Sequence, residues 1–368
     1  MSMQVTAAVA RAPHEPLTIE DLALDDLRAN EVLVRMVASG VCHTDAIVRD
    51  QVYPTPLPAV LGHEGAGIVE QVGDGVTGVR PGDHVLLAAA YCGQCKRCRS
   101  GQMAYCENLF AADFGGRRPD GTTAFSRDGQ VISSHFFGQS SFAGYSNVVQ
   151  ESVIRIDPDI PLEVVAPLGC GIQTGAGTVL NELKPSLNST LVVIGAGAVG
   201  CGALMAAGVA GCSQVIAVDI HPSRLELARE IGATATINTR EAELSEEVMR
   251  LTGGVGADYV IDTTARPELL RQGADSLGLR GTLALVGAAA PGTEVSFEIG
   301  LSLVKGWTFK TVIQGSSVPQ VFIPQLIDLW HAGRFPLDKL VRSYPLKDIN
   351  QGFEDSASGR VIKPVVVH

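Results

Sequence analysis

Basic residues are scarce in this sequence relative to acidic ones. The 368 residues include 28 Lys and Arg against 39 Asp and Glu, which gives a formal net charge of −11. The longest basic cluster is the short segment Lys96-Arg97-Cys98-Arg99. A protein of this charge repels the phosphate backbone, so we predict that nucleic acid is not a partner.

Export and membrane signals are also lacking. Residues 1–10 show no basic start followed by a long apolar core, which argues against a secretory signal. One uncharged run, residues 191–218, is long enough to span a bilayer. Six glycines interrupt this run, and a strand, a turn and a helix explain them better than a membrane span. We therefore expect no membrane association and a cytoplasmic protein.

The length and the eight cysteines narrow the class further. A chain of 368 residues exceeds the usual single-domain range, so two domains are expected, and neither an internal repeat nor a low-complexity block occurs. Hydrophobic residues at 46% with 41 glycines are typical of a compact α/β protein. In a reducing compartment the cysteines favour metal binding or catalysis over disulfides.

Cys42-His43-Thr44-Asp45, together with His63-Glu64 and Cys170, is the first candidate site. Two thiolates and one imidazole can supply three protein ligands to zinc and leave a fourth position open for a reacting oxygen. Cysteine and histidine are also common buried residues, so these residues alone do not decide between a metal site and ordinary packing.

Four further cysteines, Cys92, Cys95, Cys98 and Cys106, lie close together. Their spacings suit a compact loop that holds four thiolates tetrahedrally around one structural zinc. An iron–sulfur cluster and a set of unligated cysteines are the alternatives, although the fourth cysteine is not followed by the proline of the bacterial ferredoxin pattern. A closed site of this kind has no room for substrate.

The periodicity predicts a different architecture on each side of Cys170. Residues 5–10, 31–38, 66–72 and 85–89 are expected to be strands of an irregular, mainly β domain. After Cys170 we expect strands at 190–194, 214–218, 258–263 and 281–286, with helices at 223–231 and 267–277. This alternation predicts a doubly wound parallel sheet. Residues 321–331 are expected to be a helix and residues 361–367 a strand.

The glycines at 195, 197 and 200 predict a dinucleotide site, because they lie between a buried strand and a helix and an acid follows at Asp219. Gly195 permits the tight turn, Gly197 lets the backbone approach the pyrophosphate, and Gly200 allows close packing of helix on strand. Asp219 would accept hydrogen bonds from the adenosine ribose and repel a 2′-phosphate, which favours NAD. Arg224 keeps NADP open as the alternative.

Six of the eleven phenylalanines fall within residues 107–142. They either pack this loop onto its own domain or line an apolar substrate pocket. We take Phe110 and Phe137, with Tyr53, as candidate pocket residues.

The order of these motifs resembles the zinc-dependent medium-chain alcohol dehydrogenases. The resemblance rests on Gly62-His63-Glu64, the four-cysteine segment, Gly169-Cys170-Gly171 with Thr174-Gly175, and the Gly195 motif, and it covers essentially the whole chain. Within that family, Cys92-Gly-Gln-Cys95 and Gly116-Arg-Arg-Pro-Asp-Gly121 are similar to the aryl-alcohol (benzyl alcohol) dehydrogenases.

The resemblance implies a GroES-like catalytic domain at residues 1–171 and 315–368, and a Rossmann cofactor domain at 172–314. It implies two zinc ions per chain, with the catalytic one on Cys42, His63 and Cys170. Asp45 would orient His63, Glu64 would lie behind the zinc, and Lys363 would touch the cofactor pyrophosphate. The expected reaction is NAD-dependent oxidation of a primary aromatic or allylic alcohol to its aldehyde, with zinc as the Lewis acid.

The proton path departs from the family pattern. Thr44 would pass the hydroxyl proton outward, but the histidine that many relatives carry three residues later is Ile47 here. His43 occupies a position that is often basic and contacts the pyrophosphate. One hypothesis is that the relay ends at the cofactor ribose and solvent, and another is that His43 receives the proton.

Several alternatives stay open at this point. The nearest alternative is an S-(hydroxymethyl)thiol dehydrogenase, whose pocket would be expected to carry polar or charged groups, whereas the Phe-rich stretch favours an apolar alcohol. A broad aliphatic alcohol dehydrogenase is another alternative. A zinc-free quinone reductase and a non-enzymatic, zinc-structured NAD-binding redox sensor are further away. The family also implies a homodimer or homotetramer, for which residues 297–313 could supply an interface strand.

Overall fold

A computed structural model describes residues 3–368 and divides the chain into two compact units. The first unit comprises Met1–Cys170, Val318–Ile327 and Leu337–His368, and the second comprises Gly171–Ser317 and Asp328–Pro336. The chain thus leaves the first unit after Cys170 and returns to it near its end. The first unit is therefore discontinuous in sequence.

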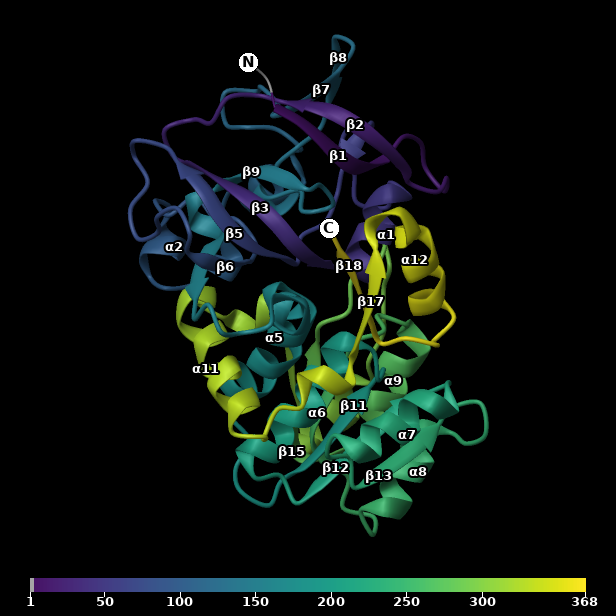
Figure 1. Cartoon of the computed structure of the whole chain (residues 1–368). Coiled ribbons are helices and arrows are strands. Elements are labelled where there is room, and N and C mark those ends of the chain that lie inside the picture. Colours follow the sequence, from purple (N-terminus) through teal and green to yellow (C-terminus); the bar gives the residue numbers. More distant parts are fainter. Residues whose placement is uncertain (1–2) are drawn as a thin grey trace. The chain divides into compact units, whose positions relative to one another are not determined.

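The first unit is built mainly from two sheets (Figure 1). The five-stranded sheet has the order β4 (Ala59–Val60), β1 (Met3–Ala10), β2 (Thr18–Leu24), β7 (Phe125–Arg127), β8 (Gln130–Ile132). The other sheet runs β10 (Val153–Ile156), β6 (His84–Leu87), β5 (Gly65–Val72), β3 (Glu31–Gly40), β18 (Lys363–Val367), β17 (Val341–Pro345), with β9 (Tyr145–Val149) also paired to β3.

Short helices fill the connections of the first unit, as expected of an irregular domain whose loops carry ligands. They are α1 (His43–Arg49), α2 (Lys96–Arg99), α3 (Leu109–Phe114), α4 (Leu162–Val165) and α12 (Ile349–Ala357), with the 3-10 turn η2 (Phe136–Gly138). Strand β18 lies antiparallel to β3, so that Val365 faces Gly40. This pairing carries the C-terminal segment, with Lys363, to the strand end that precedes Cys42.

The second unit is a six-stranded sheet with parallel pairing throughout. Its strand order is β13 (Ala235–Asn238), β12 (Gln214–Asp219), β11 (Thr190–Ile194), β14 (Ala257–Asp262), β15 (Leu277–Leu285), β16 (Thr308–Thr311). The order reverses at β11, whose carboxyl end leads into the glycine motif. In a doubly wound sheet, that reversal is where a dinucleotide binds.

Helices connect these parallel strands, because a parallel crossover needs a long connection. Helix α6 (Ala198–Ala210) packs on β11 and β12, α7 (Pro222–Glu230) on β12 and β13, and α9 (Pro267–Asp275) on β14 and β15 (Figure 1). The remaining helices are α5 (Gly171–Gly177), α8 (Leu244–Leu251) and α10 (Ile299–Lys305), while α11 (Pro319–His331) is divided between the two units.

The observed elements confirm the predicted fold class. Strand β11 has the predicted bounds, and α7, β12 and β14 each lie within one residue of theirs. Strand β15 starts four residues before the predicted start, at Leu277, and α9 ends at Asp275. The predicted helix end at 277 was wrong because Ser276 caps α9 and the following apolar residues join the sheet.

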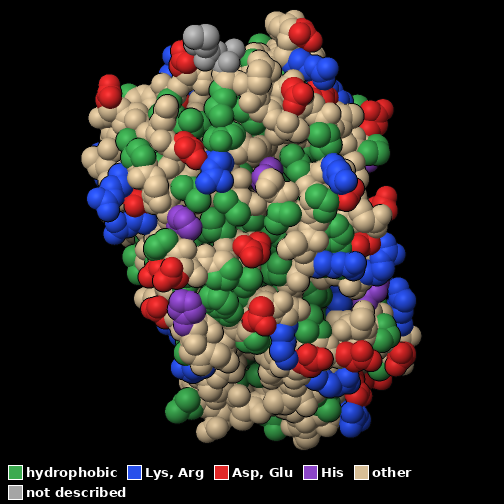
Figure 2. Space-filling model, in the orientation of Figure 1, with side chains coloured by type: hydrophobic (Ala, Val, Ile, Leu, Met, Phe, Trp, Pro, Cys, Tyr) green, Lys and Arg blue, Asp and Glu red, His purple; other side chains and the backbone are tan. Residues whose placement is uncertain are grey.

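The helices of the structure bear on the question of a membrane span. Over residues 3–368, no helix is both long and apolar enough to cross a membrane. Residues 191–218 form β11, α6 and β12, as the glycines indicated. On the face shown in Figure 2, acidic, basic and hydrophobic side chains are intermixed.

Candidate active site and metal centres

Asp45 ties the two halves of the first candidate site together. It lies in the first turn of α1, where its Oδ2 accepts a hydrogen bond from the backbone N–H of Cys42 at 2.9 Å. Its Oδ1 accepts from the backbone N–H of Gly62 at 3.0 Å and from Nδ1 of His63 at 2.9 Å. One buried carboxylate thereby fixes the positions of both Cys42 and His63.

The bond from Nδ1 leaves Nε2 of His63 as the nitrogen available to a ligand. Nε2 is buried and has no hydrogen-bond partner among the described residues. The candidate ligand atoms of Cys42, His63, Glu64 and Cys170 all lie within 4.8 Å of one another. A buried imidazole nitrogen that faces two thiols is the donor set expected for zinc, and a metal would satisfy the nitrogen that the protein leaves unpaired.

The thiols and the imidazole shift one another's pKa values even without a metal. A hydrogen bond from Cys170 lowers the pKa of Cys42 well below its usual value, against the effect of burial. The same hydrogen bond, with burial, raises the pKa of Cys170. Burial opposes charging of His63, but Asp45 and Cys42 outweigh it and raise the pKa of His63. Deprotonation of such a group is coupled to metal binding, because thiolate and neutral imidazole are the ligand forms.

Glu64 and Lys363 form a fully buried ion pair beside this group. The Nζ of Lys363 lies 2.9 and 2.8 Å from the two carboxylate oxygens of Glu64, and it donates to the carbonyl of Val41 at 3.2 Å. Burial raises the pKa of Glu64 to about 7, although Lys363 opposes this rise. Gly40 is required here, because a Cβ at this position would lie 2.0 Å from Oε2 of Glu64.

Lys363 therefore has three acceptors for its three N–H donors within the first unit. The resemblance to the family implies that this residue touches the cofactor pyrophosphate, and that contact stays a prediction. His43, the other basic residue expected at the phosphates, is exposed at the start of α1. Its role also stays a prediction.

Thr44 lies next to the thiols. Its Oγ1 is 3.9 Å from Sγ of Cys42, which places the hydroxyl at the edge of the candidate metal site. Ile47 follows one helical turn later in α1 and offers no atom that could receive a proton. A relay that starts at Thr44 must therefore leave the helix by another route.

An aromatic cluster covers His63. The Phe137 ring stacks on the imidazole with centroids 4.5 Å apart, and the Phe136 ring meets it edge-on at 5.4 Å. Phe114 contacts both phenylalanines, at 5.2 Å from Phe137 and 6.1 Å from Phe136. These phenylalanines form an apolar wall directly beside the candidate ligand.

The predicted pocket residues connect to this wall through Phe114. Tyr53 meets Phe114 edge-on at 5.9 Å, and Phe110 lies 5.7 Å from Phe114. Sequence reasoning did not select Phe114 or Phe136 as pocket residues. The spacing of Phe110 and Phe114 on one face of a short helix was a signal for Phe114.

The segment that carries Phe136 and Phe137 is held in a strained backbone. His135, Phe137 and Ser140 all have positive φ, at 58°, 52° and 52°. Gln139 fixes the segment, because its Nε2 donates to the carbonyls of His63 and Ala88 and its Oε1 accepts from the N–H of Gly65. Strained residues of this kind concentrate at functional sites, and neither they nor Gln139 could be identified from the pattern.

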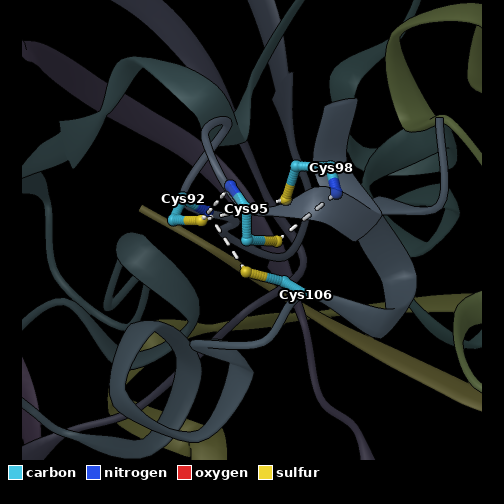
Figure 3. A group of neighbouring side chains, drawn as sticks. All are labelled: Cys92, Cys95, Cys98 and Cys106. Atoms are coloured by element: carbon cyan, nitrogen blue, oxygen red, sulfur yellow. Dashed lines mark hydrogen bonds between the residues drawn. The ribbon is translucent and has the colours of Figure 1, made fainter. Parts of the chain in front are cut away.

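The four-cysteine segment forms a second, separate group (Figure 3). Backbone N–H groups donate to its sulfurs at 3.4 Å, from Cys95 to Cys92, from Cys98 to Cys95, and from both Cys92 and Asn108 to Cys106. These bonds reach the sulfurs of Cys92, Cys95 and Cys106, because the short loops wrap around them. The donors favour thiolate, so the set suits a structural metal held by four sulfurs.

The glycine motif of the second unit has the shape of a phosphate cradle. Gly195 has a φ of 93°, and a Cβ at Gly200 would lie 1.8 Å from the carbonyl oxygen of Gly195. A Cβ at Gly197, in contrast, would meet nothing within 4 Å, so the space above the start of α6 is open. Free N–H groups at that helix start suit a pyrophosphate.

Asp219 closes the cradle at the end of β12. Its Oδ2 accepts from the N–H of Ala196 at 2.8 Å, and its Oδ1 accepts from the N–H groups of Ile220 and His221. Arg224 lies 3.8 Å from Oδ2. The negative charge therefore lies beside the glycine motif, where the ribose is expected.

Comparison with known proteins defines the class. The alcohol dehydrogenase GroES-like domain family matches residues 28–157, and the zinc-binding dehydrogenase family matches residues 198–331. The chain belongs to the zinc-dependent medium-chain alcohol dehydrogenases. It is an enzyme of that family and has the medium-chain dehydrogenase/reductase fold. The family uses zinc and NAD(P).

Individual relatives match this chain over almost its whole length. Geraniol dehydrogenase of Castellaniella defragrans is 38% identical over 98% of this chain and 97% of its own. The probable S-(hydroxymethyl)glutathione dehydrogenase 1 of Schizosaccharomyces pombe is 38% identical over 98% and 96%. The crystal structure of benzyl alcohol dehydrogenase from Acinetobacter calcoaceticus is 44% identical, covers 99% of both chains and has a TM-score of 0.96.

Proposed function

We propose that this alcohol dehydrogenase oxidises primary aromatic or allylic alcohols to aldehydes with NAD. The observation that carries the proposal is the aromatic wall of Phe114, Phe136 and Phe137 against His63. A planar, apolar substituent next to the alcohol carbon would pack on these rings, with offset or edge-on geometry. The named relatives that act on benzyl alcohol and geraniol support the same substrate class.

In this proposal Cys42, His63 and Cys170 hold the catalytic zinc, and the four cysteines of the second group hold the structural one. Zinc supplies Lewis acidity that lowers the pKa of an alcohol hydroxyl, and NAD accepts the hydride. Asp45 orients His63 by accepting from Nδ1, so that Nε2 faces inward. Lys363 neutralises Glu64, which would otherwise place a second carboxylate charge behind the thiolates.

Thr44 takes the first step of proton removal in this mechanism. Its hydroxyl, at the edge of the thiol group, accepts the substrate proton and donates its own outward. Since Ile47 cannot continue the path within α1, the proton would leave Thr44 by another route towards solvent. Gly195, Gly197 and Gly200 cradle the pyrophosphate, and Asp219 selects NAD over NADP by repelling a 2′-phosphate.

The test is an initial-rate panel on the zinc-loaded enzyme. NAD and NADP are compared with benzyl alcohol, an allylic terpenoid alcohol, ethanol and the glutathione adduct of formaldehyde. We expect kcat/KM for the first two alcohols to exceed that for ethanol by about 100-fold, since the ring or alkene is buried only in the productive complex. Activity confined to ethanol or to the thiol adduct, or a strict need for NADP, would overturn the proposal.

We further propose that the enzyme is a homodimer that pairs through β16. This strand is the last in its sheet, and an open strand edge invites pairing with another chain. Helix α10, next along the chain before β16, exposes large apolar side chains, with Ile299 83% and Leu303 80% exposed. A second copy related by a two-fold axis would cover both features in one self-complementary interface.

Leu303→Glu is the test of the dimer, and Leu187→Glu is its control, since Leu187 is equally exposed but lies outside this surface. Light scattering after size exclusion should show a dimer for the wild type and the control, and a monomer for Leu303→Glu. If the wild type is a tetramer and Leu303→Glu is a dimer, the proposed interface stands, and the tetramer has a second interface elsewhere. An unchanged mass would exclude this surface.

A further inference from the structure

Segment 116–121, which carries part of the family resemblance, has no part in the mechanism above. Gly116 has a φ of 65°, and its carbonyl accepts a hydrogen bond from the backbone N–H of Ser134 at 3.0 Å. Arg117 is exposed, whereas the side chain of Arg118 is only 3% exposed. Arg118 therefore points into the protein, and its contacts show what this segment does.

Arg118 uses all five of its N–H donors. Its Nε and Nη2 donate to the two carboxylate oxygens of Glu31 at 2.7 and 3.1 Å. Nη1 donates to Oδ2 of Asp25 at 3.0 Å and to the carbonyl of Thr123 at 3.1 Å, and Nη2 also donates to the carbonyl of Asp26 at 3.4 Å. A buried guanidinium with every donor bonded fixes the carboxylate of Glu31 in one position.

Glu31 passes this restraint to His135. Its Oε1 accepts a hydrogen bond from Nε2 of His135 at 2.8 Å. Burial opposes ionisation of Glu31, but the bonds from His135 and Arg118 outweigh it and lower the pKa of Glu31 to about 2. At neutral pH the carboxylate can therefore only accept, so Nε2 carries the proton. We call Arg118, Glu31 and His135 the Glu31 network.

The Glu31 network holds one end of a strained segment, residues 134–140. Three non-glycine residues of this segment have a positive φ, a conformation that persists only where the surroundings hold it. His135 is held at one end by its bond to Glu31, and at the other end Oγ of Ser140 donates to the carbonyl of Val60 at 2.7 Å. Loss of the bond at His135 therefore removes one of the restraints on the strained backbone.

Segment 134–140 in turn fixes His63 in two ways. The Phe137 ring stacks on the imidazole with centroids 4.5 Å apart, and the Phe136 ring meets it edge-on. Nε2 of Gln139 donates to the backbone carbonyl of His63 at 3.0 Å. The hydrogen bond at Nδ1 of the imidazole still allows the ring to tilt, and the stacked ring of Phe137 limits that tilt.

We propose that the Glu31 network positions the catalytic metal ligand His63, with segment 134–140 as the connection. This inference rests on the proposed function, in which Nε2 of His63 is the nitrogen donor to the catalytic zinc. Loss of a partner that orients a metal-bound histidine typically costs about 10- to 100-fold in metal affinity or activity. The residues of the network are positioning residues, because they act on the metal through His63.

The alternative explanation is purely structural, in that the network only fastens residues 107–142 to β3. Both explanations predict a lower unfolding temperature on substitution. Only the positioning role predicts that the change appears at one of the two zinc sites, the one that contains His63, while the four-cysteine site keeps its zinc.

The experiment measures zinc release from the holoenzyme to an excess of the chelator pyridine-2,6-dicarboxylate. His135→Asn is the first variant, because asparagine tolerates a positive φ but is too short to reach Glu31, which keeps its bonds to Arg118. Glu31→Gln is the second variant. For both we expect the zinc on His63 to be released about tenfold faster than in the wild type, and the four-cysteine zinc at an unchanged rate. His63→Ala, which would lack the first zinc, identifies its phase of the release.

Cobalt(II) in place of the catalytic zinc adds a spectroscopic readout, because its visible absorption depends on the geometry of the ligands. A tilt of the His63 ring changes that geometry. The visible band should therefore shift in His135→Asn and in Glu31→Gln.

Glu20→Gln is the matched control for Glu31→Gln. Glu20 is also a buried carboxylate on a strand, and a hydrogen bond from Arg11 lowers its pKa to about 2. The arginines that bind it, Arg11 and Arg127, lie outside segment 134–140. Its zinc release and its cobalt spectrum should match those of the wild type.

The outcomes separate the two proposals. If His63→Ala holds as much zinc as the wild type, His63 is not a zinc ligand and the proposed function fails. If it holds one ion fewer, but folded His135→Asn releases zinc and absorbs as the wild type does, the inference fails. Equal acceleration at both zinc sites, or in Glu20→Gln, would mean general destabilisation and also overturn the inference. Unfolding temperatures show which variants are folded, and either His135→Asn or Glu31→Gln suffices for the test.

Discussion

The first unit contains two clusters of candidate metal ligands, the four-cysteine segment and the set of Cys42, His63 and Cys170. The two clusters differ in how the chain brings their residues together. Cys92, Cys95, Cys98 and Cys106 lie in one short segment, and N–H groups of that segment donate to three of their sulfurs. Cys42, His63 and Cys170 come from three distant segments, and a carboxylate, an ion pair and a ring stack hold them. Local loops thus suffice for a closed site, whereas an open site needs support from the surrounding fold.

The largest expected effect is on the distant group. His63→Ala removes the one nitrogen donor, so we expect kcat to fall by about 1,000-fold or more and bound zinc to fall from two ions to one. Steady-state rates and elemental analysis measure the two quantities. A variant that keeps both zinc ions and its turnover would show that this group is not the catalytic centre.

Thr44 tests the same group without touching a ligand. Thr44→Val removes the hydroxyl and keeps the shape, and turnover should fall by about 100-fold, the usual contribution of a proton-transfer group. Thr44→Ser keeps the hydroxyl and serves as the matched control, with most activity retained. Equal rates for the valine and serine variants would mean that the proton does not pass through this residue.

Cys98→Ser probes the local group, where the expected effect is on stability. If these four sulfurs hold a structural zinc as proposed, loss of one sulfur would weaken zinc binding, so the unfolding temperature should fall by roughly 5 °C or more. Turnover per folded molecule should fall less than in His63→Ala. Calorimetry measures the unfolding temperature, and active-site titration gives the turnover per folded molecule on the same preparation. A larger loss of turnover in Cys98→Ser than in His63→Ala would reverse the two assignments.

The smallest effect concerns the support of the aromatic wall. Burial opposes ionisation of Glu31, but hydrogen bonds from His135 and Arg118 outweigh it and hold the pKa of Glu31 at about 2. A carboxyl whose pKa is lowered by folding stabilises the protein above its unfolded pKa and loses this effect as the pH falls. We expect the ionised Glu31 to contribute on the order of 2–3 kcal/mol to the free energy of unfolding at neutral pH, and this contribution is lost between about pH 4.5 and pH 2.

Glu31→Gln should remove that dependence. Denaturant unfolding from pH 7 to pH 2 measures the free energy of unfolding for both proteins. Their difference should be largest at neutral pH and should shrink below about pH 4.5. A constant difference across this range would mean that the charge of Glu31 has no role in holding His135.

The glycine motif shows how much of the second unit a pattern can define. Buried strands, the three glycines and the terminal acid follow one another closely in the chain, so period and spacing were enough to predict β11, β12 and the helix between them. The bounds of α9 and β15 were less accurate, because a helix cap and a sheet compete for the same apolar residues.

The sequence by itself determined the features that depend on neighbours along the chain. These are the alternation of strands and helices, the glycine cradle, the four-cysteine loop and the identity of Cys42, His63 and Cys170 as candidate ligands. The first three rest on spacing within a few residues, which fixes local geometry. The three candidate ligands come from distant segments, and their choice rests on the resemblance to the family.

Only the tertiary structure decided which distant groups meet. It engaged Lys363 with Glu64, joined Tyr53 to the wall through Phe114, and stacked Phe137 on His63. These contacts join residues far apart in the chain, and their geometry depends on how the sheets and loops pack. A one-dimensional pattern carries no information about that packing.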